Sequence, residues 1–115
     1  PFTPVEVYDR VITALDTGAD AVIPALPVAD TIKRVADGIV VATVDRCDLV
    51  AVQTPQGFRV ATLRCAHEQQ TDAVTDDAML VETMGVPVHV VAGSHDAFKI
   101  TTAFDLAVAR AMREV

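Results

Sequence analysis

The sequence predicts an α/β fold, because short aliphatic runs alternate with segments of helical periodicity. Residues 20–26, 39–44, 49–53 and 88–91 are runs of this kind, rich in Val, Ala, Leu and Ile. Such strands suit a sheet that helices cover on both faces, and aromatic residues make up only 4% of the chain. The 115 residues suffice for one small domain. Because 51% of them are hydrophobic, we expect some apolar surface to meet another subunit or another part of the same fold.

The charge and the cysteine content argue against several classes of protein. The net charge is −7, the isoelectric point is about 4.6, and the longest basic run is the pair Lys33-Arg34. Polymeric nucleic acids are bound through basic patches, so we expect no nucleic-acid partner. No apolar stretch reaches ~18 residues without a charge or a proline, so we expect neither a membrane span nor a secretory leader. Cys47 and Cys65 have neither metal nor redox spacing, which favours a reducing cytoplasm.

The first predicted element is a helix that begins near residue 4 and ends before Gly18. Thr3 can cap its first amides, Pro4 fits the first helical position, and Glu6 would complete a capping box. Its apolar residues recur at helical spacing, at Val5, Tyr8, Ile12 and Leu15. Residues 20–26 then predict a short buried strand interrupted by proline.

Residues 31–44 predict a β-hairpin, in which Asp37-Gly38 joins strands at residues 31–35 and 39–44. The second strand has Thr43 as its only polar residue, which is unusual for a ribbon exposed to water. A lone two-stranded hairpin is marginally stable in water. We therefore expect this hairpin to pack against a partner, and we interpret it as a dimerisation arm.

The rest of the chain continues the alternation of strands and helices. A strand at residues 49–53 ends at Thr54-Pro55. Thr75 and the acids after it suit a helix start, Gly85 suits its end, and Thr102 with Asp105 suits another start. The elements expected after residue 55 are helices at residues 58–70, 75–84 and from 102 onward, and strands at residues 88–91 and 98–101.

Five polar segments lie at the predicted ends of these elements. Taken singly they have ordinary explanations, because hydroxyls at helix starts usually cap and Arg46 and Lys99 are by default solvated surface charges. Taken together, in this order, they resemble the C-terminal half of the 2-C-methyl-D-erythritol 4-phosphate cytidylyltransferase family. The segments are residues 30–34 (DTIKR), 44–46 (VDR), 53–58 (QTPQGF), 75–78 (TDDA) and 99–102 (KITT).

The segment at residues 53–58 carries the resemblance most sharply, although the ribitol 5-phosphate cytidylyltransferases share it. Residues 30–34, followed by Asp45-Arg46, favour the methylerythritol phosphate family. The resemblance implies that residues 1–115 are the C-terminal part of a single domain, a Rossmann-like nucleotidyltransferase sheet with an extended β-hairpin dimerisation arm at about residues 31–44. The family transfers a cytidylyl group from CTP to 2-C-methyl-D-erythritol 4-phosphate with Mg²⁺ and releases pyrophosphate, in non-mevalonate isoprenoid precursor biosynthesis.

The resemblance also implies a homodimer and five substrate-binding residues. Thr31 and Arg46, at the feet of the arm, would reach the sugar phosphate bound in the neighbouring subunit. Thr54, Thr75 and Lys99 would line the same pocket from their own subunit. Arg46 and Lys99 would be catalytic, because they position the attacking phosphate. These residue types suit the chemistry, since two anions must approach each other and fixed cations offset their repulsion.

Two features depart from the family pattern. Ala97-Phe98 precedes Lys99 where many members carry Asn, which leaves Asp96 as a weak candidate for a metal or sugar contact. The family's glycine-rich loop and its His-Asp-Ala-Ala-Arg stretch do not occur in the 115 residues, so we expect this chain alone neither to bind CTP nor to turn over. The alternatives are a cytidylyltransferase for ribitol 5-phosphate or another polyol phosphate, and a non-catalytic fragment that retains the dimer arm.

The remaining reactive side chains have structural explanations. The histidines at positions 67, 89 and 95 are spaced too widely to favour a metal site, and no metal ligands are predicted. Cys65 lies on an apolar helix face and suits a small core position. Met79, Met84 and Met112 are likewise expected in the core.

Overall fold

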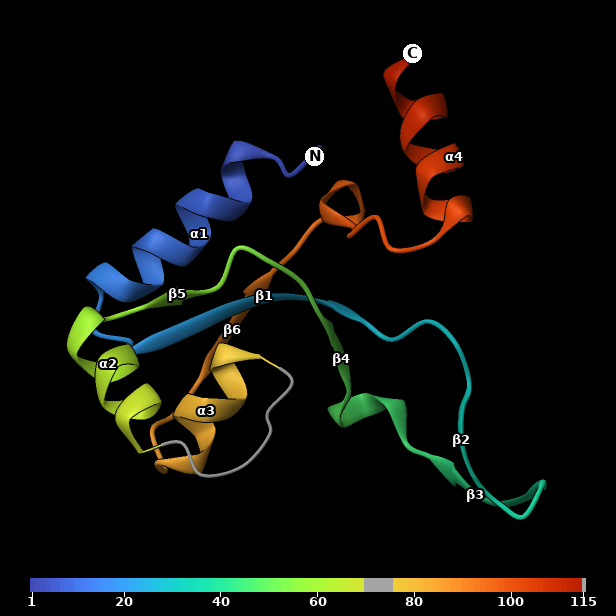
Figure 1. The fold of residues 1–115 in the computed structure, drawn as a ribbon, viewed down its shortest axis with the longest axis horizontal. Helices are drawn as coiled ribbons and strands as arrows, with labels where there is room; N and C mark the ends of the chain where they lie inside the picture. Colours follow the sequence, from blue (N-terminus) through green and yellow to red (C-terminus); the bar gives the residue numbers. More distant parts are fainter. Residues whose placement is uncertain (70–75, 115) are drawn as a thin grey trace.

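The computed structural model describes residues 1–69 and 76–114. Its elements alternate as expected, which confirms the α/β class (Figure 1). The α-helices are α1 (Val5–Asp16), α2 (Val60–Glu68), α3 (Asp77–Thr83) and α4 (Ala103–Arg113). The strands are β1 (Ala21–Pro27), β2 (Ile32–Ala36), β3 (Ile39–Val44), β4 (Val50–Val52), β5 (Gly57–Phe58) and β6 (His89–Ala92), and two short 3₁₀ helices are η1 (Arg46–Asp48) and η2 (His95–Ala97).

Strand β1 is the centre of the main sheet. Strand β6 pairs with it in parallel on one edge, and β4 and β5 pair with it antiparallel on the other. The register places Ala25 opposite both Val52 of β4 and Ala92 of β6. The segments that follow β4 and β6 therefore leave the sheet on either side of the same part of β1.

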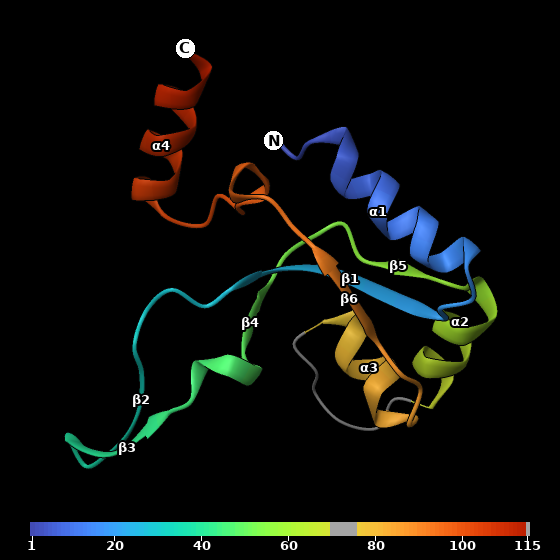
Figure 2. The same cartoon turned by 180° about the vertical axis from the view of Figure 1, so that it is seen from behind.

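Helices cover both faces of this sheet, with α1 on one side and α2 and α3 on the other (Figures 1 and 2). Successive residues of β1 point to opposite faces. Ala21 accordingly packs with Leu80 and Val81 of α3, whereas Val22 packs with Val11 of α1. All residues of β1 from 21 to 25 are buried, so the proline-containing strand predicted at residues 20–26 is confirmed as the core of the domain.

Helix α1 differs from its prediction in two respects. It begins at Val5 with Pro4 as the N-cap and without a side-chain cap, so the capping box of Thr3 and Glu6 is wrong because Thr3 lies one residue too early. The helix also buries Val7 and Val11 against the sheet. The predicted apolar face points largely to solvent, with Val5 69%, Tyr8 47% and Ile12 53% exposed.

The other helix ends combine confirmed and corrected predictions. Helix α4 has the predicted capping box of Thr102 and Asp105. Helix α3 is capped by the carboxylate of Asp76, which accepts a hydrogen bond from the amide of Met79 at 2.8 Å. Thr75, expected at this helix start, lies outside the described residues.

The strand predicted at residues 98–101 is wrong. These residues pair with no strand in the part of the chain that the structure describes. The amide of Thr101 donates to the carboxylate of Asp105 instead, at 3.0 Å. Met79 also differs from its predicted core position and is 38% exposed, whereas Met84 packs against the core as expected.

The predicted hairpin is confirmed and forms a separate two-stranded sheet of β2 and β3. Asp37 and Gly38 both have positive φ, at 50° and 76°, which is the conformation of a two-residue hairpin turn with the correct twist. The arm extends away from the main sheet in both views (Figures 1 and 2). Its apolar side chains are exposed, with Ile39 at 69%, Val40 at 53% and Val41 at 56%.

No helix among residues 1–69 and 76–114 is both long enough and apolar enough to span a membrane.

The capping box of α4 leads to a prediction about pH. Asp105 accepts hydrogen bonds from the backbone and the hydroxyl of Thr101 and from the backbone of Thr102, and these bonds lower its pKa from the usual 3.8 to about 2. A lowered pKa stabilises the fold above pH 3.8, and that stabilisation is lost as the pH falls through 2.

We expect the carboxyl resonance of Asp105 in an NMR titration to have its midpoint near 2. Asp105→Asn is the matched variant, because it should loosen the start of α4 already at neutral pH and remove the pH dependence there. A midpoint near 3.8 in the native chain would contradict the prediction.

Candidate functional site

The candidate site is built where the segments after β4 and β6 meet beside β1. The amide of Gln53, just after β4, donates to the carbonyl of Pro24 at 2.8 Å, and the amide of Gly93, just after β6, donates to the carbonyl of Ala25 at 2.9 Å. Both segments are thus anchored to the same part of the central strand. Open α/β sheets commonly place ligand sites beyond the carboxyl ends of their strands.

A polar cavity of about 230 Å³ lies at this position. It brings together Thr54 and Lys99, two of the predicted substrate-binding residues, from segments far apart in the sequence. Lys99 is the only cationic side chain among the described residues that line it, and Asp76 is the only carboxylate there. The full lining consists of Val52, Gln53, Thr54, Gln56, Asp76, Ala97 and Lys99.

Asp76 connects helix α3 to the cavity. One oxygen of its carboxylate accepts from the amide of Met79 at 2.8 Å, and the other accepts from Nε2 of Gln56 at 3.2 Å. The carboxylate is therefore both a helix cap and a support for the 53–58 segment. Gln56 lies in the segment 53–58 and Asp76 in the segment 75–78. Within these two segments, only Thr54 and Thr75 were predicted to bind substrate.

Gln53 ties the two cavity segments to each other. Its side-chain Nε2 donates to the carbonyl of Ser94 at 2.8 Å, and its Oε1 accepts from the amide of Ser94 at 3.0 Å. Because Gln53 and Gly93 lie on opposite edges of β1, this side chain reaches across the strand. A Cβ atom at Gly93 would lie only 2.2 Å from Oε1 of Gln53, so the close approach requires glycine at position 93.

The arm residues Thr31 and Arg46 do not line this cavity in the described chain. Both are exposed, and the guanidinium of Arg46 donates to the carbonyl of Ala29 at the foot of the arm. The preceding Asp45 accepts from the amide of Cys47 at 3.0 Å, and this contact lowers the pKa of Asp45. The structure therefore brings Thr54 and Lys99 together and leaves Thr31 and Arg46 apart from them, while Thr75 lies outside the described residues.

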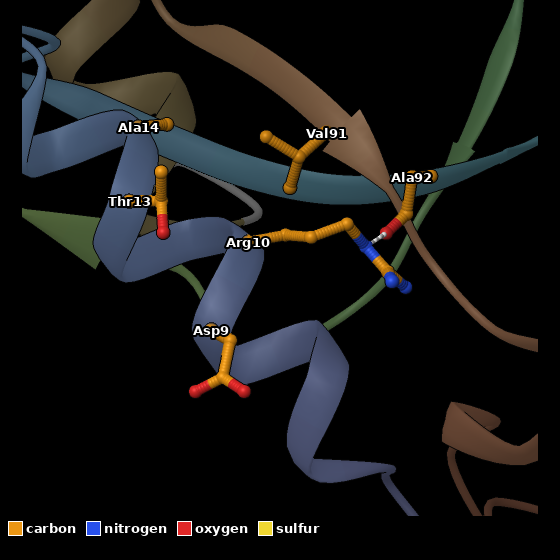
Figure 3. Close-up of a pocket in the computed structure, with 6 residues that line it drawn as sticks. All are labelled: Asp9, Arg10, Thr13, Ala14, Val91 and Ala92. Atoms are coloured by element: carbon orange, nitrogen blue, oxygen red, sulfur yellow. Dashed lines mark hydrogen bonds between the residues drawn. The ribbon is translucent and has the colours of Figure 1, made fainter.

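A second, more open cavity of about 480 Å³ lies between α1 and β6 (Figure 3). Arg10 of α1 extends along it toward the end of β6, where its Nε donates to the carbonyl of Ala92 at 2.7 Å. Its Nη2 donates to the carbonyl of Gly93 at 3.3 Å. A single arginine on an amphipathic helix gives no sequence signal of such a contact, and Arg10 was not predicted. The lining consists of Asp9, Arg10, Thr13, Ala14, Val91 and Ala92.

The histidines and acids form no metal centre in the described chain. No group of three His, Cys, Asp or Glu side chains that could hold a metal ion occurs among residues 1–69 and 76–114. His67 contacts Asp77 instead, at 3.1 Å. Asp96 does not line the polar cavity, and its amide donates to the hydroxyl of Ser94 at 3.2 Å.

The fold is that of an α/β domain, and its cavity at the ends of the strands is a candidate ligand site. Residues 1–114 match the family model of 2-C-methyl-D-erythritol 4-phosphate cytidylyltransferase, IspD. The chain belongs to this family.

Individual relatives agree with the family match. The 2-C-methyl-D-erythritol 4-phosphate cytidylyltransferase of Streptomyces avermitilis is 51% identical over 97% of this chain and 48% of its own length. That of Saccharopolyspora erythraea is 54% identical over 96% of this chain and 50% of its own length. The crystal structure of 2-C-methyl-D-erythritol 4-phosphate cytidylyltransferase from Thermus thermophilus matches the whole of this chain, with a TM-score of 0.88 and 39% sequence identity. The match covers 58% of the Thermus thermophilus chain. The chain spans about half the length of the curated relatives that it matches.

The contact at Gly93 leads to a prediction about stability. Gly93→Ala should destabilise the fold by about 1–3 kcal/mol, because its Cβ would displace the amide of Gln53 from its two hydrogen bonds with Ser94. Urea unfolding measures the free energy change. Gly93→Ala combined with Gln53→Ala provides the control, since the shortened side chain makes room and the double variant should lose less than the sum of the two. Strict additivity would show that the two positions do not compete for this space.

Proposed function

We propose that this chain supplies the sugar-phosphate site for cytidylyl transfer from CTP to 2-C-methyl-D-erythritol 4-phosphate, with release of pyrophosphate. Residues 1–115 would be the C-terminal part of a single nucleotidyltransferase domain. The observation that carries the proposal is the polar cavity in which Thr54 and Lys99 meet. The family membership and the names of the relatives support the choice of substrate and reaction.

The lining of the cavity suits a phosphomonoester. The ammonium of Lys99 is a compact positive charge that attracts the phosphate, and the hydroxyl of Thr54 can orient the ligand by a hydrogen bond without adding charge. An oxygen of the bound phosphate is already ionised at neutral pH, so it can attack the α-phosphorus of CTP without a general base. The new P–O bond forms as the bond to pyrophosphate breaks, and the fixed cation offsets the repulsion between the two anions.

The arm supports a homodimer as the working unit. Its valines and isoleucines are exposed in the single chain, and apolar side chains on a hairpin of this kind need a partner surface. Thr31 and Arg46 lie at its feet, outside the cavity of their own chain. In the dimer that we propose, the arm of one subunit would deliver both residues to the cavity of the other, where Arg46 would grip the phosphate with its planar fork of donors.

Mg²⁺ would accompany the triphosphate of CTP, since this ion commonly binds through substrate phosphates with one or two carboxylates. The described residues offer no coordinating cluster. Asp76 is the only carboxylate among the described cavity residues, and both its oxygens already accept hydrogen bonds. We therefore assign it no metal. The free thiols of Cys47 and Cys65 support the reducing cytoplasm as the location.

A pyrophosphate-release assay with CTP and Mg²⁺ tests the proposal. Two proteins are assayed, this chain alone and a fusion. The fusion joins this chain to the part of the Streptomyces avermitilis relative that the chain does not match. We expect turnover by the fusion, with methylerythritol phosphate preferred over ribitol 5-phosphate. Preference for ribitol 5-phosphate would instead support the polyol-phosphate alternative. A folded fusion without turnover would support the non-catalytic fragment.

Substitution of the two cations tests their roles. In the fusion, Lys99→Met and Arg46→Met should each lower kcat/KM for methylerythritol phosphate about 10²–10³-fold, because each removes a charge that stabilises the transition state. Arg64→Met, at an exposed position of α2 outside the cavity, is the matched control and should leave kcat/KM unchanged. Full activity in either cation variant would remove that residue from the mechanism.

Substitution of the arm tests the dimer. Val40→Lys and Val41→Lys, at two exposed positions of β3, should together weaken self-association at least tenfold in sedimentation equilibrium, because burying an unpaired charge is costly. Val60→Lys on α2, an apolar position that is also exposed, at 64%, should not weaken it. Equal association constants for the arm variant and the native chain would contradict the role of the arm.

A further inference from the structure

The turn that begins at Gly93-Ser94 and closes as η2 connects β6 to the segment that carries Lys99. Two side chains from elsewhere in the chain hold the backbone of this turn, Gln53 from the segment after β4 and Arg10 from α1. Neither residue is among the predicted substrate-binding residues. Both side chains contact the backbone shortly before Lys99, the cation that lines the cavity.

Gln53 holds the second residue of the turn by both of its backbone groups. The side-chain amide accepts from the Ser94 N–H and donates to the Ser94 carbonyl. The same carbonyl accepts from the amide of Ala97 at 3.0 Å and so closes η2. Ala97 is buried and lines the cavity. The Ser94 carbonyl therefore links Gln53 to the 3₁₀ helix that precedes Lys99.

Arg10 holds the same turn from the α1 side of the sheet. Its guanidinium donates to the carbonyl of Ala92 at 2.7 Å (Figure 3). It also donates to the next carbonyl, that of Gly93, at 3.3 Å. A charged donor makes stronger hydrogen bonds than a neutral one. With Gln53, it fixes the backbone of residues 92–94 by four hydrogen bonds.

Lys99 follows η2 closely in the chain. Among the described residues, no hydrogen bond or ion pair holds its ammonium. A flexible side chain is placed by its own backbone, and small misplacements of a charge that acts on a reacting group lower rates strongly.

We propose that Arg10 and Gln53 are positioning residues, which set the place of Lys99 opposite Thr54 by holding the Gly93-Ser94 turn. The inference rests on the proposed function for its consequence in substrate binding. Its structural part, the dependence of residues 94–99 on these two side chains, does not require turnover.

The experiment uses the whole 115-residue chain and NMR titration with methylerythritol phosphate. In Gln53→Glu the acceptor for the Ser94 amide remains, but a carboxylate oxygen replaces the donor and faces the Ser94 carbonyl. Arg10→Met removes both donors and keeps the aliphatic stem. We expect both variants to shift the amide resonances of residues 94–99 and to weaken binding at least about tenfold. Arg10→Lys, which can restore one donor, should recover part of the affinity.

Arg59→Met is the matched control for a purely structural effect. Arg59 also donates to a backbone carbonyl, that of Leu15 at 3.0 Å, and pairs with Asp20 at 3.2 Å, but it does not contact the turn. It should lower the melting temperature as the other variants do, without changing the affinity or the resonances of residues 94–99.

The outcomes separate the two proposals. Unchanged resonances of residues 94–99 in both Gln53→Glu and Arg10→Met would overturn the positioning role, whatever the affinity. Equal losses of affinity in Arg59→Met and Arg10→Met would also overturn it. If the native chain binds no methylerythritol phosphate, the proposed substrate site fails in this chain, and the resonances still decide whether the two residues position Lys99.

Discussion

Strand β1 is paired on both edges and buried on both faces, and the placement of every other feature depends on it. Its residues from 21 to 25 alternate between the α1 face and the face of α2 and α3. Its backbone receives β4 and β5 on one side and β6 on the other. The common register at Ala25 brings the ends of β4 and β6 level with each other. A polar cavity can form there because two segments from distant parts of the sequence leave the sheet together.

The proposed reaction brings two anions together, and the chain carries its two candidate cations in different places. A single chain gives the cavity one cation, Lys99, among its described lining residues. A second cation, Arg46, lies at the foot of the exposed arm. Fixed positive charges near the reacting oxygens offset the repulsion between two phosphates. The proposed dimer would cover the apolar side chains of the hairpin and would carry Arg46 to the partner's cavity.

The sequence predicted local features better than packing. The Asp37-Gly38 turn and the capping box of Thr102 follow from the chemistry of a few adjacent residues, and both are confirmed. The prediction of which face of α1 is buried was wrong. Aliphatic residues occur around most of that helix, and only packing against the sheet decides which of them are buried. The strand at residues 98–101 was wrong because a strand needs a partner edge, which local propensity does not reveal.

The candidate site shows the same limit. The resemblance implied one pocket for Thr54 and Lys99, and both residues line the cavity, while their contact with a substrate stays a prediction. The contacts of Gln53 and Arg10 with the turn could not be predicted, since each depends on the register of three strands and on the approach of α1.

The most direct test of the account is a crystal structure of the chain with bound 2-C-methyl-D-erythritol 4-phosphate. The account predicts that the phosphate lies in the polar cavity against Thr54 and Lys99 of one copy, and that Arg46 of a second copy completes its contacts. Electron density for the ligand only in the cavity between α1 and β6, or a phosphate bound without Lys99, would contradict it.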